Sequence, residues 1–367
     1  MANLFVVFTP LQLVVAQQII RQENLSDNVM LESSIGKFSE IYNLIRDDIS
    51  WKKVLLFKNW ANWDESGTHI IKNFIKVKRK SEEIRQILID NQIDTIYLAD
   101  FQNQTNRFSC VWLSKLGYKV VFYEEGYSHY IPRVGYPPSN NVLHKVYEII
   151  IDWLYYQPLY RIDFAKWRCY VNKDYHGLPI YLRYSIIPGI HHEPYDKILT
   201  YKPMISPKLQ SYIDEEVGDT EEKKLLLLTD PMTEILATDY RFLYFETIKE
   251  QLSNYKDCHL YIKFHPRDSI EDREHITKIA EESGYTYTIL GNRINIPVEF
   301  YLQNIVFSSV LFFNTSTFFY NGLLFPATRF VKLLPILYNK CKDRNVPDLV
   351  QMELILKSIS KHALHAN

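Results

Sequence analysis

The sequence predicts an α/β protein with two Rossmann-like domains facing across a cleft and a C-terminal helix that packs back. Short apolar segments of strand length alternate with helical patterns in both halves of the chain, which is typical of parallel sheets with covered faces. The 367 residues exceed what one ordinary core holds. Pro179, Pro188 and Pro194 mark a linker-like passage between the halves. We expect an N-terminal domain over residues 1–190, a C-terminal domain over 191–345 and a helix over 346–367.

The first half opens with a strand and a helix. Leu4 to Phe8 is a continuous apolar run of the kind buried in a parallel sheet. Thr9 is a good helix cap and Pro10 suits the first helical position, so a helix should follow. Further strands are predicted at Asn28–Glu32, Val54–Lys58, Thr95–Leu98 and Lys119–Tyr123. Helices are predicted at Phe38–Asp47, Thr68–Asn91 with a break near Lys80, and Asn103–Lys115.

The segment from Tyr147 to Tyr175 is crowded with large aromatic residues, among which basic residues are interspersed. An amphipathic helix pair that covers the sheet explains this pattern. A face that binds an acceptor or a membrane surface is the alternative, because aromatic and basic side chains together suit sugars and interfaces. Trp153–Tyr170 is the candidate membrane contact.

The second half repeats the alternation of strands and helices. Strands are predicted at Lys197–Tyr201, Lys224–Thr229, His259–Phe264, Thr286–Leu290, Val306–Phe313 and Thr328–Lys332. Helices are predicted at Ser206–Asp214, Thr233–Ser253, Ser269–Ser283, Pro297–Leu302 and Thr317–Leu324. A last helix, Asp348–His362, carries an apolar stripe formed by Leu349, Met352, Leu356 and Ile359.

Composition excludes several classes of protein. A formal net charge of −1 gives no general attraction to nucleic acid or to an anionic membrane. The 4 cysteines are far apart and match neither a metal site nor a disulfide framework, so a cytoplasmic location is the simplest expectation. The apolar run Ala2 to Phe8 is too short for a membrane span and lacks the flanks of a signal peptide.

His265 is the first candidate for chemistry. The strand-like Leu260 to Phe264 stops at His265-Pro266, since proline cannot donate to a sheet ladder. An imidazole is thus placed at the carboxyl end of a strand, where open α/β sheets bind ligands. It could donate a proton to a leaving phosphate oxygen, and Lys263 and Arg267 could add positive charge. A strand followed by an ordinary polar turn is the alternative.

Glu124-Glu125-Gly126 also follows a buried strand. Successive strand residues point to opposite sides, so one of the two carboxylates should face the cleft. Such a carboxylate can accept a proton from an incoming hydroxyl. The following loop, with Tyr127 and His129, has the hydrogen-bonding and stacking groups that a sugar site needs. An exposed acidic turn is the alternative explanation.

Three further segments are candidates for binding. Asn314 to Thr317 follows an apolar strand, and Ser316 and Thr317 at a helix N-terminus would form a phosphate cradle. Glu299 follows Pro297 at a helix start, where it could hold ribose hydroxyls. Asp230 ends another strand and could serve as a base. Ordinary helix capping and N-terminal helix chemistry explain each of these segments equally simply.

Several catalytic motifs are absent from the sequence. It contains no Gly-rich dinucleotide fingerprint, no Walker-type phosphate loop, no His-Glu-x-x-His and no Gly-x-Ser-x-Gly. The Asp-x-Asp that metal-dependent sugar transferases commonly use is also missing.

Taken in order, these segments resemble bacterial sialyltransferases of the lipooligosaccharide sialyltransferase and capsule polysialyltransferase type. Those families carry an acidic-acidic-Gly motif, a later His-Pro motif and a Ser/Thr-rich motif, here Glu124-Glu125-Gly126, His265-Pro266 and Ser316-Thr317. The opening Phe8-Thr9-Pro10-Leu11-Gln12 and the segment Ile296-Pro297-Val298-Glu299 are also similar. One departure is that paired serines are usual in the third motif, whereas this chain has Thr315-Ser316-Thr317.

The resemblance implies a GT-B fold and inverting transfer of sialic acid from CMP-sialic acid to a hydroxyl of a surface glycan, a lipooligosaccharide or a capsule. It also implies that no metal and no cofactor are needed, which fits the missing Asp-x-Asp. Glu124 or Glu125 would be the base, with Asp230 in reserve, and His265 would assist departure of CMP. The implied donor-binding residues are Lys263, Pro266, Glu299, Asn314, Ser316 and Thr317. The implied acceptor-binding residues are Gln12, Gly126, Tyr127 and His129. Peripheral association with the inner face of the cell membrane and a homodimer are compatible with this reading.

Other functions fit the same pattern. A related transferase with a glucose donor and a glycerophosphotransferase share a two-domain architecture and a His-Pro segment. A sugar-nucleotide epimerase has the same architecture and needs no acceptor. A glycan-binding protein without catalysis is the alternative from another class, and it has no reason to place His265, Glu125 and Ser316 after strands.

Overall fold

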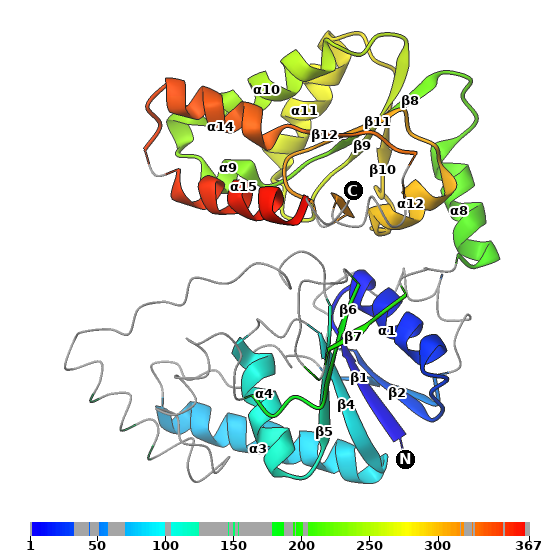
Figure 1. The fold of residues 1–367 in the computed structure, drawn as a ribbon, viewed down its shortest axis with the longest axis vertical. Coiled ribbons are helices and arrows are strands. Elements are labelled where there is room, and N and C mark those ends of the chain that lie inside the picture. The colour runs from blue at the N-terminus through cyan, green and yellow to red at the C-terminus, as the bar shows by residue number, and fades with distance from the viewer. Residues whose placement is uncertain are drawn as a thin grey trace. The chain divides into compact units, whose positions relative to one another are not determined.

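The computed structural model divides the chain into two compact units, Met1–Ser39 with Arg46–Pro203, and Glu40–Ile45 with Met204–Asn367. It describes residues 2–32, 44, 51–57, 70–99, 104–124, 146, 150, 153, 178–186, 194, 196–200, 205–315, 317–318, 325, 327–347 and 349–363. Each unit is an α/β layer structure, as predicted (Figure 1). The boundary lies after Pro203, later than the expected position at residue 190.

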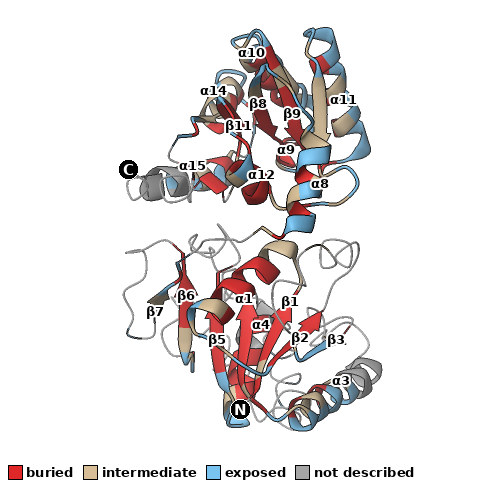
Figure 2. Ribbon diagram, turned by 90° about the vertical axis from the view of Figure 1, so that its right-hand side faces the viewer, coloured by how far each residue is buried: buried red, intermediate tan, exposed pale blue. Residues whose placement is uncertain are grey.

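The first unit contains a sheet of parallel strands. In chain order these are β1 (Ala2–Val7), β2 (Asn28–Glu32), β3 (Lys53–Leu56), β4 (Ile93–Ala99), β5 (Lys119–Tyr123), β6 (Leu182–Ser185) and β7 (Asp196–Ile198). Their order across the sheet is β3-β2-β1-β4-β5-β6-β7, and every pair is parallel. β1, β2 and β5 are buried along nearly all of their length, which explains their apolar sequences (Figure 2).

Helices cover both faces of this sheet. α1 (Pro10–Gln22) lies on one face, and α3 (Ile70–Asp90) and α4 (Gln104–Lys115) lie on the other (Figures 1 and 2). The expected break near Lys80 is wrong, because α3 runs through it without interruption. Beyond that point Ile84 and Leu88 are buried against the sheet, so the amphipathic stripe that forms the helix continues.

β6 and β7 correct the predicted linker. The sequence pattern assigned residues 179–194 to a linker and the following strand to the second domain, but β6 pairs with β5 and β7 pairs with β6. Arg183 in β6 is buried, and its Nε and Nη2 donate to the Asp196 carboxylate over 2.6 and 2.8 Å. A charged residue inside a strand of 4 residues conceals its apolar pattern.

The second unit contains a second parallel sheet. Its strands are β8 (Lys223–Leu228), β9 (Cys258–Lys263), β10 (Tyr287–Leu290), β11 (Ser309–Phe312) and β12 (Phe330–Lys332), in the order β10-β9-β8-β11-β12. Its described helices are α8 (Pro207–Val217), α9 (Met232–Ile235), α10 (Phe242–Leu252), α11 (Ile270–Glu282), α12 (Val298–Asn304), α14 (Leu334–Asp343) and α15 (Val350–Ala363). Register pairs such as Leu228 with Lys263 and Phe312 with Leu228 bring the carboxyl ends of β8, β9 and β11 to one edge.

In this unit one predicted helix is divided and another helix was not predicted. The single helix predicted at Thr233–Ser253 is divided into α9, a 3-10 turn (Thr238–Tyr240) and α10, because Leu236 leaves helical geometry and is buried. α14 has no counterpart in the prediction. Phe38–Asp47 and Thr317–Leu324 lie largely outside the described residues.

The C-terminal helix packs back onto its own unit. α15 contacts α14, Met352 is fully buried, and the Tyr338 hydroxyl donates to Glu353 over 2.8 Å. Of the aromatic and basic segment, the structure describes Ile150 and Trp153, and both are exposed. No helix in the described part of the chain is long and apolar enough to cross a membrane.

Candidate functional site

The polar residues of the second unit gather at a topological switch point. In the order β10-β9-β8-β11-β12, successive strands are added on one side of β8 and then on the other, so the order reverses between β8 and β11. In open α/β sheets, ligands bind outside the carboxyl ends of the strands at such a point. Thr229 and Asp230 follow β8, His265 follows β9, and Asn314 follows β11.

The turn after β9 is held by buried hydrogen bonds. The backbone N–H of His265 donates to the Asp268 carboxylate and to the Thr229 hydroxyl, each over 2.8 Å. The Thr229 hydroxyl also contacts the same carboxylate, and Thr229 and Asp268 are both buried. The backbone N–H of Asp268 donates to the His265 carbonyl over 3.0 Å. His265 is therefore held in place by its own turn and by the neighbouring strand.

The imidazole of His265 has a defined tautomer. The Arg267 backbone N–H donates to Nδ1 over 3.1 Å, so in the neutral ring Nε2 carries the proton. Burial lowers the pKa of His265 to about 4, helped by Arg267, Lys263 and Arg273. Arg273 also donates to the His265 carbonyl over 3.3 Å. At neutral pH the ring is thus an uncharged donor in a positively charged surrounding.

Asp230 lies at the switch point itself. Its side chain accepts from the backbone N–H of Asn314, which follows the neighbouring strand β11. Asp230 is 7% exposed, and its Oδ2 has no hydrogen-bond partner in the described part of the chain. The Asn314 Oδ1 is also buried without a partner there. Burial, reinforced by Asp268, raises the pKa of Asp230 to about 8.

Glu299 and Thr317 form a second polar pair near β11. The Thr317 hydroxyl donates to the Glu299 carboxylate over 2.9 Å, and both side chains are buried. The Thr317 backbone N–H donates to the Thr315 hydroxyl over 3.3 Å. Burial raises the pKa of Glu299. The helix start that carries Glu299 is therefore tied to the segment after β11; Ser316 lies outside the described residues.

Lys263 does not open onto the rim. It is 8% exposed, and its Nζ donates to the Asn295 Oδ1 over 2.7 Å. Burial lowers its pKa to about 8, against the opposing effect of Glu216 and Glu299. Pro266, the other donor-binding candidate of this segment, is exposed in the turn. The ammonium group is therefore engaged with the loop that follows β10.

The first unit contributes two described candidates. The Gln12 Oε1 accepts from the Phe8 backbone N–H over 2.6 Å, and the Gln12 N–H donates to the Thr9 hydroxyl over 3.3 Å. The Thr9 hydroxyl caps the start of α1, and the Gln12 side-chain oxygen is engaged by the backbone just before that cap. Glu124 is fully buried, and its Oε2 accepts from the Ile186 backbone N–H over 2.6 Å.

The remaining candidates of the first unit lie outside the described residues. They are Glu125, Gly126, Tyr127 and His129. Their roles stay predictions. Within the described residues no group of three or more His, Cys, Asp or Glu side chains is arranged to hold a metal ion.

Sequence comparison identifies the family. The profile of the alpha-2,8-polysialyltransferase (POLYST) family matches residues 3–333, and so spans both sheets. The chain belongs to the alpha-2,8-polysialyltransferase family. It is therefore a glycosyltransferase that uses a sugar-nucleotide donor and a glycan acceptor, which confirms the resemblance to capsule polysialyltransferases. A comparison with curated proteins gives no match.

Solved structures share the fold of this polysialyltransferase family member. UDP-GlcNAc 2-epimerase from Neisseria meningitidis bound to UDP-GlcNAc aligns with a TM-score of 0.51 at 10% identity, over 92% of this chain and 85% of that chain. The UDP-N-acetylglucosamine 2-epimerase from Rickettsia bellii aligns with a TM-score of 0.50 at 11% identity, over 99% and 96%. At these identities the likeness shows the fold alone. It confirms the expected α/β fold of two Rossmann-like units, which these epimerases share.

Sequence reasoning missed four residues of this candidate site. Thr229, Asp268 and Arg273 hold the His265 turn, and Glu216 on α8 accepts from the loop after β10. Asp268 stands three residues after His265, a spacing at which an Asp side chain commonly closes a turn onto backbone N–H groups. That local signal could have identified Asp268. Thr229 and Glu216 act across strands and helices, for which no local signal exists.

Proposed function

We propose that this polysialyltransferase family member transfers sialic acid from CMP-sialic acid to a hydroxyl of a surface glycan, with inversion and without a metal. The observation that carries the proposal is the neutral, Nε2-protonated His265 at the strand rim, among the cations Lys263, Arg267 and Arg273. A site of this kind favours an anionic leaving group. The family match over residues 3–333 supports a sialyl donor.

Departure of CMP is the step that His265 assists. The bond between the anomeric carbon of sialic acid and the phosphate oxygen breaks, and negative charge grows on the phosphate. Nε2–H of His265 donates to that oxygen as the charge grows. Ser316 and Thr317 cradle the phosphate, and Glu299 holds the ribose hydroxyls. This placement is supported by the hydrogen bond that the Thr317 hydroxyl donates to the Glu299 carboxylate.

A carboxylate takes the proton of the acceptor hydroxyl as its oxygen bonds to the anomeric carbon. The Glu124-Glu125-Gly126 segment supplies this base, with Asp230 in reserve. One oxygen of Glu124 is bonded to the Ile186 N–H, and Glu125 lies outside the described residues. Asp230 offers a buried oxygen without a partner among the described residues and a pKa of about 8.

Three variants identify the base. Glu124→Gln, Glu125→Gln and Asp230→Asn each replace a carboxyl group with an amide of nearly the same size. The variant that has lost the base transfers roughly 100-fold more slowly or worse, while its affinity for CMP stays near that of the wild type. Thermal shift with CMP measures that affinity independently of turnover.

A donor panel tests the function. The purified protein is incubated with CMP-sialic acid, with UDP-sugars and with CDP-glycerol, each with and without sialoside- or lactose-type acceptors. We expect CMP-sialic acid to be the one donor that is turned over. Release of CMP should require an acceptor and should be unchanged by EDTA. Turnover of a UDP-sugar without acceptor would instead indicate an epimerase. Release from CDP-glycerol would indicate a glycerophosphotransferase, and no turnover of any donor would support a glycan-binding protein.

A further inference from the structure

The loop of residues 291–296 joins β10 to α12 and is hydrogen-bonded by two charged side chains. Lys263 reaches it from the end of β9, and Glu216 reaches it from α8. We propose that Lys263 is a positioning residue, which with Glu216 holds this loop for the nucleoside of the donor instead of binding the donor's phosphate. The part of this inference that concerns the nucleoside rests on the function proposed above.

The ammonium group of Lys263 contacts both ends of this loop. Nζ donates to the Asn295 Oδ1 over 2.7 Å, and Asn295 is exposed whereas Lys263 is buried, so Asn295 covers it. At the other end of the loop Gly291 lies so close that a Cβ added to it would stand 2.8 Å from Nζ. Gly291 also has φ +73°, a conformation that suits glycine. The loop is therefore shaped around the ammonium group.

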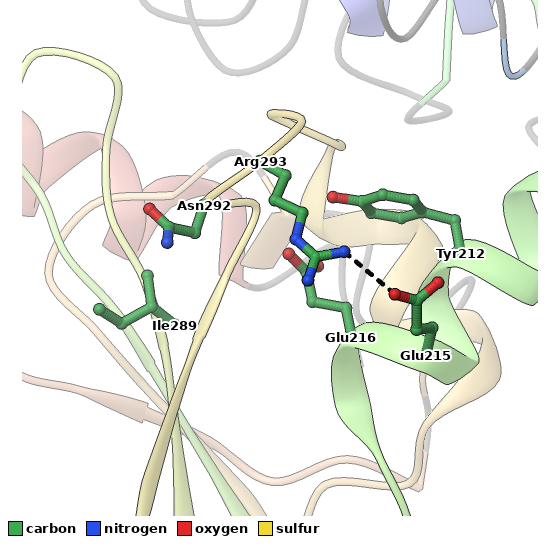
Figure 3. A pocket seen from close by; sticks show the side chains of 6 residues that line it. All are labelled: Tyr212, Glu215, Glu216, Ile289, Asn292 and Arg293. Atoms are coloured by element: carbon green, nitrogen blue, oxygen red, sulfur yellow. Dashed lines mark hydrogen bonds and ion pairs between the residues drawn. The ribbon is translucent and has the colours of Figure 1, made fainter.

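The Glu216 side chain holds the same loop through the loop's backbone. The Gly291 N–H donates to Oε1 over 3.0 Å, and the Tyr301 hydroxyl of α12 donates to Oε2. Glu216 lines a pocket of about 220 Å³. Figure 3 shows Arg293, another lining residue, turned toward Glu215. Those two groups lie 3.0 Å apart but are mostly exposed, so their ion pair adds little. Glu216 and Lys263 are the two charges that carry the loop.

The loop leads directly to Glu299. Ile296 is fully buried, Pro297 is the cap of α12, and Glu299 lies in the first turn with its carboxylate bonded to Thr317. Glu216 contacts both the start of the loop and Tyr301 further along α12. A displaced loop therefore moves the helix start that carries Glu299. Nucleoside affinity should depend on Lys263 although Lys263 touches no part of the nucleoside.

Hydrogen–deuterium exchange in the ligand-free protein tests the loop contact without any assumption about function. Lys263→Met removes the donor, and Asn295→Ala removes the exposed acceptor with little risk to folding. Both variants should speed exchange across residues 291–296 at least about threefold, the Gly291 amide included. Lys249→Met on α10, which breaks an exposed ion pair with Glu282, is the control and should leave this loop unchanged. Wild-type exchange rates in both site variants would overturn the proposal.

Calorimetric titration with cytidine and with CMP distinguishes positioning from phosphate binding. A positioning lysine should weaken both ligands by the same factor, roughly tenfold, because the nucleoside is common to them. A lysine that binds phosphate would weaken CMP and leave cytidine unchanged, and that result would contradict the proposal. Asn295→Ala should behave as Lys263→Met does, to a smaller extent.

The two proposals can fail separately. If the wild-type protein binds neither cytidine nor CMP, the proposed donor is wrong, and the exchange experiment still decides the loop contact. If the wild type binds CMP but Lys263→Met weakens CMP alone, the donor stands and the positioning role is wrong.

Discussion

The backbone N–H of Arg267 donates to Nδ1 of His265 over 3.1 Å, and this bond leaves Nε2–H as the donor that the imidazole offers to a substrate. Burial and the cations Arg267, Lys263 and Arg273 together lower the pKa of His265 to about 4. The ring can therefore donate without carrying a charge of its own at neutral pH. It gains basicity only when an anion binds beside it.

Removal of one cation should raise the pKa of His265. In Arg273→Met we expect an increase of about half a unit or more, toward the ordinary value near 6.5. NMR titration of the His265 imidazole in the wild type and in Arg273→Met measures this directly. An unchanged pKa would contradict the electrostatic account. Since the unfolded chain takes up a proton between pH 6.5 and 4 and the folded chain does not, this histidine also contributes to acid destabilisation in that window.

Asp230→Asn should stabilise the protein at alkaline pH. The pKa of Asp230 is raised to about 8, so between pH 4 and 8 the folded chain retains a proton that the unfolded chain releases, and stability falls as the pH rises. An amide removes this penalty while it still accepts from the Asn314 N–H. We expect a gain of about 1–3 kcal/mol at pH 8 and almost none at pH 4. Urea unfolding at both values measures it, with the exposed Asp239→Asn as control; equal effects at both values would refute the prediction.

The affinity for cytidine should be pH-dependent through Lys263. Its pKa is lowered to about 8 by burial, and it lies near the carboxylates Glu216 and Glu299 and the opposing cation Arg273. Deprotonation above that value removes the positive charge that the two carboxylates face. Cytidine should bind several-fold more weakly at pH 9.5 than at pH 7 in the wild type. In Lys263→Met the affinity should be flat over this range, and a flat wild-type profile would contradict the assignment.

Removal of one partner of the Arg183–Asp196 ion pair should destabilise the protein far more than replacement of both partners by apolar residues. The side chains are 3% and 7% exposed, so Arg183→Met alone removes the positive charge that faces a buried carboxylate and should cost about 3–5 kcal/mol. The double variant Arg183→Met/Asp196→Leu should recover most of that loss. Lys52→Met, which breaks an exposed pair, should cost less than about 1 kcal/mol. Urea midpoints of the three variants decide it, and a double variant no better than the single would contradict the account.

Local sequence patterns predicted much of the fold. Asn28–Glu32 and Lys119–Tyr123 are strands with the predicted ends, because both are buried and bounded by polar residues. The stop of β9 before His265-Pro266 was likewise predicted. β6 was missed because Arg183 is charged and its partner, Asp196, lies in the next strand. Short strands whose charges are neutralised by a neighbour lack a readable pattern.

The site was less predictable because it depends on strand order. Asp230 and Asn314 meet only because β8 pairs with β11, a contact between segments 84 residues apart in the sequence. Strand alternation predicts that Lys263 lies on the same side as His265, two residues further on, but β9 ends at Lys263 itself. Its side chain is buried under Asn295 instead. The residue types of the site could be recognised, whereas their partners required the sheet.

Acceptor-dependent release of CMP from CMP-sialic acid, compared between the wild type and His265→Ala, tests the central claim most directly. Loss of one donor to the departing phosphate costs about 3–4 kcal/mol, so turnover should fall roughly 100- to 1000-fold while the melting temperature stays near that of the wild type. His275→Ala, a histidine stacked on Phe245 away from the β9 turn, should keep full turnover. Wild-type rates of CMP release by His265→Ala would contradict the account.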